Sequence, residues 1–240
     1  MPKPISFIKI ERELQQGNYH LSKTKIDKLQ KIKQISRTKK PKGLWYSTNK
    51  WITHDIHTDK QKQNICCYIY KVKIKKSDVT SNINDTTKSK ILQIKTIKQL
   101  DAFIGKYEYK NPKTYYNINW RSVSRDFKGI EFKPYINLSK IEKEKKIISM
   151  EDYIINKFNK TPKKKEKTQN ISQKQLDDNW DYYYNIYYKE YYSTFITKYG
   201  FYDTIDIDSG CIWDTSILDI GDIDDIELLY KKNNNKWFIN

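Results

Sequence analysis

A histidine, a tyrosine and a glutamate stand on three separate short segments that favour β-structure: His20, Tyr46 and Glu131. Together they offer an imidazole, a phenolic hydroxyl and a carboxylate, groups that hydrogen-bond a ligand or stabilise charge. Glu131 lies between Ile130 and Phe132, and side chains alternate between the two faces of a strand. If the two apolar neighbours face the core, Glu131 faces a cleft or solvent. The alternative for Glu131 is an ordinary exposed strand glutamate.

Other reactive side chains carry weaker patterns. His54 and His57 are one helical turn apart, but a zinc site needs a third ligand and a second shell, so solvated histidines are favoured. Asp206 and Asp208 alternate with apolar residues and lack the spacing of a calcium loop. Cys211 lies in an apolar stretch, which favours a buried structural thiol over a nucleophile. The sequence therefore predicts no metal site.

Lysine dominates the charge of the chain. The 240 residues include 46 basic and 29 acidic side chains, a formal net charge of +17, and only four of the basic residues are Arg. A selected phosphate binder is expected to use more Arg, and the abundance of Lys, Asn, Ile and Tyr is typical of an AT-rich genome. Residues 1–176 carry +25 and residues 177–240 carry −8. Either the acidic part packs on the basic body, or that body keeps a basic face for an anionic partner such as nucleic acid.

The composition also limits the location of the chain. The aromatic share of 14% excludes a wholly disordered chain. No run of about 18 apolar residues is present, so no membrane span is expected, and the first residues lack a signal-peptide pattern. The three cysteines, Cys66, Cys67 and Cys211, fit no disulfide framework. We expect a reduced intracellular protein in the cytoplasm, of a host cell or a virus.

Hydrophobic spacing predicts an α+β fold with a mixed, mainly antiparallel sheet and flanking helices. An edge strand or short helix is expected within 6–20, and a loop over 77–89. The predicted strands cover 44–47, 65–74, 91–96, 129–132, 201–213 and 226–239. The predicted helices cover 24–36, 49–58, 97–107, 140–159 and 178–199, the last ending at Gly200, and a short helix or turn is expected over 119–126.

The three segments with His20, Tyr46 and Glu131 give the chain a resemblance to the ADP-ribosyltransferase fold. That family places a His or Arg on the first core strand, an aromatic or Ser-Thr element on the second, and a Glu on a later strand. The chain also resembles a group of uncharacterised viral and bacterial proteins with the pattern PxGLWxS, GIExxPY and SGCIW, found here at residues 41–47, 129–135 and 209–213.

The resemblance implies roles for five residues and NAD as a substrate, with no metal. His20 is expected to bond the adenosine ribose, and Tyr46 to stack on the nicotinamide. Ser47 and Thr48 are expected to brace the cleft. Glu131 is expected to bond the nicotinamide ribose 2′-hydroxyl and stabilise an oxocarbenium-like centre. One position departs from arginine-specific members, which carry Glu or Gln two residues before the catalytic Glu, where this chain has a glycine.

These observations predict an NAD-binding-type core over 1–138, a lysine-rich exposed helix and connection over 139–176, and a Tyr-rich helix with acidic strands over 177–240 that completes the domain. The predicted function is ADP-ribosyl transfer from NAD to a macromolecule, or NAD cleavage. The alternative is a non-enzymatic basic adaptor that binds nucleic acid or a protein partner, which salt-dependent binding would reveal.

Overall fold

The computed structural model of the chain describes residues 3–14, 17–36, 38–48, 67–87, 90–109, 118–159, 172–202, 205, 207–218, 225–233 and 236–240. The predicted helix over 49–58, with His54 and His57, lies outside these residues, as do Cys66 and Asp206. The chain divides into two compact units, described separately below. The first contains 1–110, 118–136 and 204–240, and the second contains 111–117 and 137–203.

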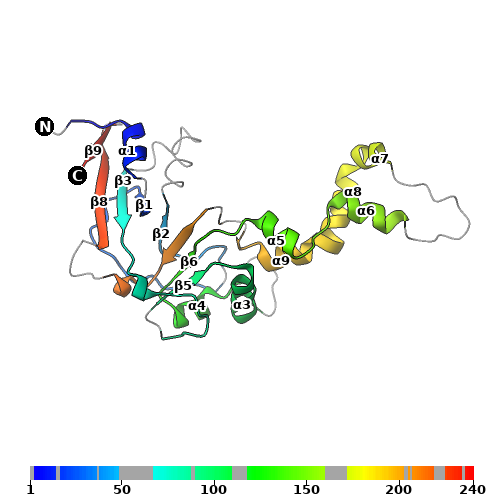
Figure 1. Ribbon diagram of the computed structural model, residues 1–240, viewed down its shortest axis with the longest axis horizontal. Helices are drawn as coiled ribbons and strands as arrows, with labels where there is room; N and C mark the ends of the chain where they lie inside the picture. Colours follow the sequence, from blue (N-terminus) through cyan, green and yellow to red (C-terminus); the bar gives the residue numbers. More distant parts are fainter. Residues whose placement is uncertain are drawn as a thin grey trace, which may run out of the picture. The chain divides into compact units, whose positions relative to one another are not determined.

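A nine-stranded open sheet organises the first unit, in the order β4-β5-β6-β7-β2-β1-β3-β8-β9 (Figure 1). The strands are β1 (Asn18–Ser22), β2 (Leu44–Ser47), β3 (Tyr68–Val72), β4 (Val79–Thr80), β5 (Ile91–Ile94), β6 (Gly129–Phe132), β7 (Ser209–Ile212), β8 (Ile226–Asn233) and β9 (Lys236–Ile239). Among the ladders of the described strands, only β4–β5 and β5–β6 are parallel. The prediction of a mixed, mainly antiparallel α+β sheet is confirmed.

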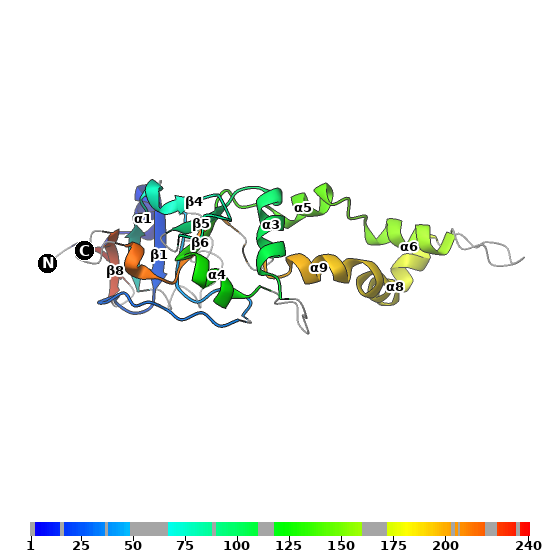
Figure 2. The same ribbon diagram turned by 90° about the horizontal axis from the view of Figure 1, so that it is seen from below.

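Helices α3 (Ile97–Tyr107) and α4 (Trp120–Asp126) lie beside β5 and β6 (Figures 1 and 2). Thr96 and Gln99 form a capping box at the start of α3, and the apolar residues three and four apart give the helix one buried face. The rings of Phe103 and Trp120 pack with centroids 5.9 Å apart. The sequence predicted a helix over 97–107 and a short helix or turn over 119–126, and both segments are helical.

Another group of buried side chains lies beside α1 (Phe7–Glu13), towards the β9 edge. Ile10 and Leu14 are buried with residues of β1, β3, β8 and β9. Two short 3₁₀ turns, η2 (Lys76–Asp78) and η5 (Thr215–Ile217), complete the regular structure described in this unit.

The predicted helix over 24–36 is wrong, because residues 25–35 have no regular secondary structure. Its apolar residues recur every three positions, which suits an extended chain with three residues per turn better than an α-helix of 3.6. Ile26 and Leu29 pack on the sheet. The amides that a helix would have satisfied donate elsewhere: Ile26 to the Tyr70 hydroxyl at 2.8 Å and Ile32 to the Trp213 carbonyl at 2.7 Å.

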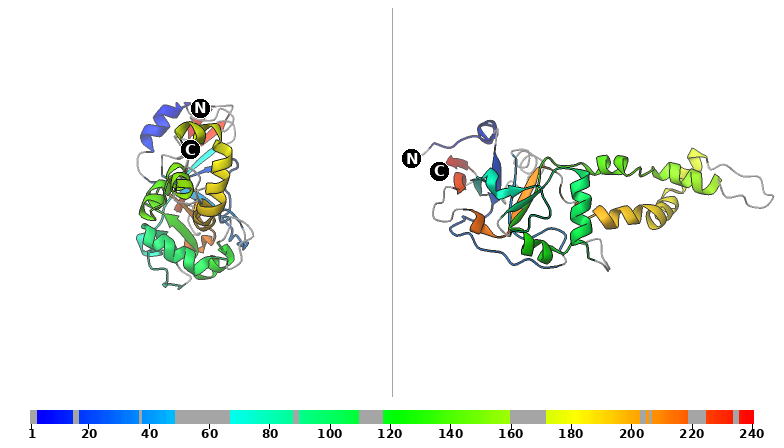
Figure 3. Two further views of the ribbon diagram at one scale, coloured as in Figure 1. Left: turned by 90° about the vertical axis from the view of Figure 1, so that its right-hand side faces the viewer. Right: turned by 60° about the horizontal axis from the view of Figure 1, so that its bottom comes forward.

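The second unit is helical. It contains α5 (Leu138–Glu144), α6 (Met150–Asn159), α7 (Gln173–Asp178), α8 (Trp180–Tyr187), the π-helical turn η3 (Tyr188–Tyr192) and α9 (Ser193–Tyr199). The helix predicted over 178–199 is present from 180 onward, and Gly200 is its C-cap. Helices α6 and α8 lie side by side (Figure 3).

The single exposed helix predicted over 140–159 is wrong in two respects. The helix is interrupted after α5, where Lys146 takes a positive φ of 55°. Helix α6 is not solvated on all sides, because Met150 and Ile154 are buried with Tyr187 of α8. The strands expected over 201–213 and 226–239 are also shorter or divided: β7 covers only four residues, and β8 and β9 form two antiparallel strands.

Candidate functional site

The side chains of His20, Tyr46 and Glu131 belong to one row that crosses the sheet. Glu131 of β6 and Tyr46 of β2 are both in register with Gly210 of β7, which lies between them. Tyr19 is in register with Ser47 in the antiparallel β1–β2 pair, which places His20 opposite Tyr46. Residues directly opposite each other present their side chains on the same face.

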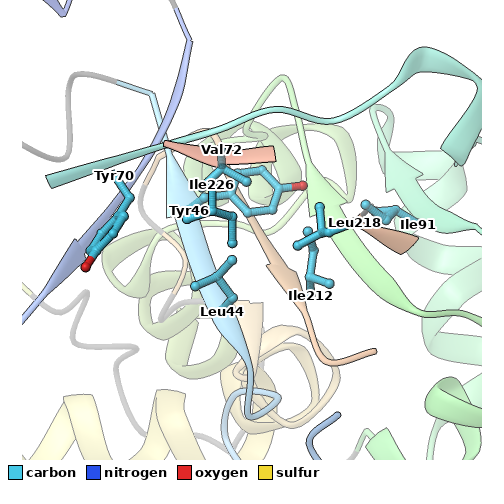
Figure 4. Close-up of a cluster of buried hydrophobic side chains, with 8 residues drawn as sticks. All are labelled: Leu44, Tyr46, Tyr70, Val72, Ile91, Ile212, Leu218 and Ile226. Carbon is cyan, nitrogen blue, oxygen red and sulfur yellow. The ribbon is translucent and has the colours of Figure 1, made fainter. Parts of the chain in front are cut away.

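Gly210 allows Tyr46 to reach Glu131 over the intervening strand. A Cβ built on Gly210 would lie 2.3 Å from both Cζ and Oη of Tyr46, so the ring occupies the space of the missing side chain. In Figure 4 the ring extends from β2 with its hydroxyl end directed towards β6. The hydroxyl donates to Glu131 Oε1 at 3.4 Å. The two residues are 85 positions apart in sequence and meet through the sheet alone.

Gln93 also belongs to this row, although it was not predicted from the sequence. It is in register with Glu131 across the parallel β5–β6 pair, and its Nε2 donates to Glu131 Oε2 at 2.5 Å. The signal was present in the sequence: Gln93 is a polar residue between Leu92 and Ile94, the same pattern that singled out Glu131.

Burial dominates the electrostatics of the pair. Glu131 is 4% exposed and Tyr46 is 1% exposed. Burial raises the pKa of Glu131, while the Lys133 charge and the hydrogen bonds from Gln93 and Tyr46 oppose that rise. Burial, reinforced by the nearby carboxylate, raises the pKa of Tyr46 well above its ordinary value. The Tyr46 hydroxyl therefore keeps its proton and acts as the donor.

His20 is half-buried, and its contacts define its tautomer. Nδ1 lies 2.6 Å from the Trp45 carbonyl oxygen, which only accepts, so Nδ1 carries the proton. Burial lowers the pKa of His20, which favours the neutral ring at neutral pH. Nε2 of the neutral ring is then a hydrogen-bond acceptor.

Ser47 and Thr48 are held by the chain next to β7. Alternation along β2 places Ser47 on the face opposite to Tyr46. Its hydroxyl donates to the Asp208 carbonyl at 2.6 Å, and the Thr48 amide donates to the same oxygen at 3.4 Å. Asp208 Oδ1 in turn accepts from the Tyr135 amide at 2.6 Å. Ser47 therefore stabilises β2 from the opposite face of the sheet and is not part of the row.

Cys211, the candidate nucleophile, has the surroundings of a structural residue. Cys211 is buried as predicted, and burial raises its pKa well above the ordinary range, so it is a protonated thiol and a poor nucleophile.

A groove of about 400 Å³ in the second unit is lined by Glu190, Tyr191 and Phe195 among others, and a hollow of about 30 Å³ lies beside Gln93.

No group of three or more His, Cys, Asp or Glu side chains in the described ranges could hold a metal ion. No helix within that part of the chain is both long and apolar enough to cross a membrane.

No protein-family model, curated protein or solved structure matches this chain. The resemblance to ADP-ribosyltransferases therefore depends on the residues themselves.

Proposed function

We propose that this chain cleaves NAD and transfers the ADP-ribosyl group to a macromolecular acceptor, with Glu131 as the catalytic carboxylate. The observation that carries the proposal is the contact between Tyr46 and Glu131 across Gly210, in the same row of the sheet as His20. These are the three side chains on which the resemblance depends. Three residues chosen by type alone could have fallen on different faces of a nine-stranded sheet.

The surroundings of Glu131 fit a carboxylate that stabilises positive charge. NAD supplies an ADP-ribosyl group whose bond to nicotinamide breaks as positive charge develops on the ribose. Two donors, Gln93 and Tyr46, hold the carboxylate in a site that excludes water, where a fixed charge acts most strongly. Once the substrate is bound, a carboxylate so placed needs no further reorganisation when charge develops.

His20 and the neighbouring lysines suit the rest of such a substrate. Nε2 of His20 accepts a hydrogen bond, and ribose hydroxyls are donors of the matching kind. The Lys133 and Lys95 charges act on Glu131 and so lie near it. In the proposal these two lysines attract the anionic diphosphate of NAD.

The burial of the pair sets a condition on binding. Tyr46 and Glu131 are almost fully covered, so the side chains above the row must move before a substrate reaches the carboxylate. Lys133 Nζ donates to Asn18 Oδ1 at 3.1 Å, which links the end of β6 to β1. In the proposal this contact opens on NAD binding, and the nicotinamide then stacks on Tyr46.

The test is release of nicotinamide from NAD labelled in the nicotinamide ring. Glu131→Gln keeps the size of the side chain and removes its charge, so we expect a loss of about 10²- to 10³-fold in turnover. Glu227→Gln is the matched control, because Glu227 is exposed on β8 and pairs with Lys73 at 3.5 Å, away from the row. Equal turnover by wild type and Glu131→Gln, or no NAD binding by calorimetry, would refute the proposal.

A further inference from the structure

Gln93 belongs to the row, and neither the resemblance nor the sequence pattern assigned it a task. We propose that Gln93 is a positioning residue that, together with Tyr46, holds both oxygens of the Glu131 carboxylate and sets its orientation and charge state. The catalytic consequence of this inference rests on the proposed function. The contact itself does not.

The two donors approach Glu131 from opposite sides. Gln93 on β5 donates to Oε2 at 2.5 Å, and Tyr46 on β2 donates to Oε1 at 3.4 Å. A carboxylate held at one oxygen still rotates about its last side-chain bond, whereas one held at both oxygens does not. The Gln93 contact is the shorter of the two, so it is the stronger constraint on that rotation.

Main-chain pairing sets the distance between Gln93 and Glu131. Gln93 and Glu131 are Cα partners in the parallel β5–β6 ladder, where adjacent strands lie about 4.8 Å apart. Both strands are in the interior of the sheet, between β4 and β7. The donor is therefore fixed by main-chain pairing, unlike a side chain that reaches in from a loop.

The chemistry of the amide favours an ionised Glu131. The Nε2 group of glutamine only donates, so it stabilises the carboxylate more than the neutral acid. Burial acts in the opposite direction and raises the pKa of Glu131. Removal of the Gln93 donor should therefore raise the pKa of Glu131, because one of the contacts that oppose the effect of burial is lost. The carboxylate should then hold its proton to higher pH.

The experiment measures the titration of Glu131 directly, without reference to activity. Protein labelled with ¹³C at the glutamate carboxyl carbon is titrated by NMR, and the Glu131 signal is identified by its loss in Glu131→Gln. We compare wild type with Gln93→Leu, which removes the donor, and with Gln93→Glu, which keeps the shape and adds a second carboxylate. Gln99→Leu is the matched control, because Gln99 is used in the capping box of α3.

We expect the midpoint of Glu131 to rise in Gln93→Leu and to rise further in Gln93→Glu, because like charges disfavour ionisation. The turnover number for nicotinamide release should fall about 10- to 100-fold in Gln93→Leu with little change in KM. Gln99→Leu should change neither the midpoint nor the turnover number, although it weakens the helix cap.

The outcomes separate the two proposals. An unchanged midpoint in Gln93→Leu overturns the inference, whatever the added carboxylate of Gln93→Glu does by charge repulsion. A midpoint raised in the Gln93 variants, together with a wild-type protein that does not cleave NAD, supports the hold of Gln93 on Glu131 and overturns the proposed function. A raised midpoint with active wild type and an unaltered turnover number in Gln93→Leu overturns the positioning role in catalysis.

Discussion

The close approach of Tyr46 to Gly210 leads to a quantitative prediction for Gly210→Ala. The added Cβ would lie 2.3 Å from Cζ and Oη of Tyr46, closer than any real carbon contact. The ring is buried and in van der Waals contact on its apolar side, so it must shift away from Glu131. Overpacking of a core costs about 1–3 kcal/mol, and loss of a hydrogen bond to a charged group costs about 1.5–3 kcal/mol.

We expect Gly210→Ala to lower the free energy of unfolding by about 2.5–6 kcal/mol, measured by urea denaturation. The matched control is Gly105→Ala in α3, where a Cβ meets nothing within 4 Å. That change should instead stabilise the protein by about 0.5–1 kcal/mol, because alanine restricts the unfolded chain.

A double-mutant cycle isolates the steric cause. In a Tyr46→Leu background the space above Gly210 is empty, so Gly210→Ala should cost little there, and the two changes should be coupled by more than about 1 kcal/mol. Additive effects, or a Gly210→Ala protein within about 0.5 kcal/mol of wild type, would refute the reasoning.

Three further predictions concern stability. The raised pKa of Glu131 means that the folded state binds the proton more tightly, so the free energy of unfolding should fall as pH rises above about 4.3 through the raised pKa, by at most about 1.4 kcal/mol per pH unit. Urea titrations across this window should show a shallower slope in Glu131→Gln, and parallel curves would contradict the prediction. The lowered pKa of His20 has the opposite sign: stability is present above about pH 6.5 and is lost as the pH falls, and His20→Gln should flatten that loss in thermal melts. Gln34 is buried and exchanges hydrogen bonds with Lys42 N and O at 2.9 and 2.6 Å, so Gln34→Leu should cost about 1–3 kcal/mol in urea, whereas the exposed neighbour Lys33→Ala should remain within about 0.5 kcal/mol of wild type.

Local patterns were sufficient for the elements whose sequence and environment agree. Helix α3 has an apolar stripe and its own cap, so its bounds of 97–107 follow from the sequence. The segments around Tyr46 and Glu131 are short, β-branched or aromatic, and bounded by Gly or Pro, and both are strands. The α+β class follows from such elements taken together.

Patterns failed where distant parts of the chain supply the hydrogen bonds. Residues 24–36 have apolar residues three apart, but their backbone donors are satisfied by Tyr70 and Trp213 rather than within a helix. The interruption between α5 and α6 depends on the backbone conformation of the single residue Lys146, and no residue type in that segment predicts it.

The sequence by itself determined which side chains were candidates: His20, Tyr46 and Glu131 were identified by type and by the strands that carry them. Tertiary structure decided that they share one row, because β7 enters the sheet between β2 and β6 and brings Gly210 into the gap. It also decided that Gln93 completes the row, since the partner of a strand residue is set by strand pairing. Strand order depends on contacts between residues far apart in the chain, and local spacing carries no record of them.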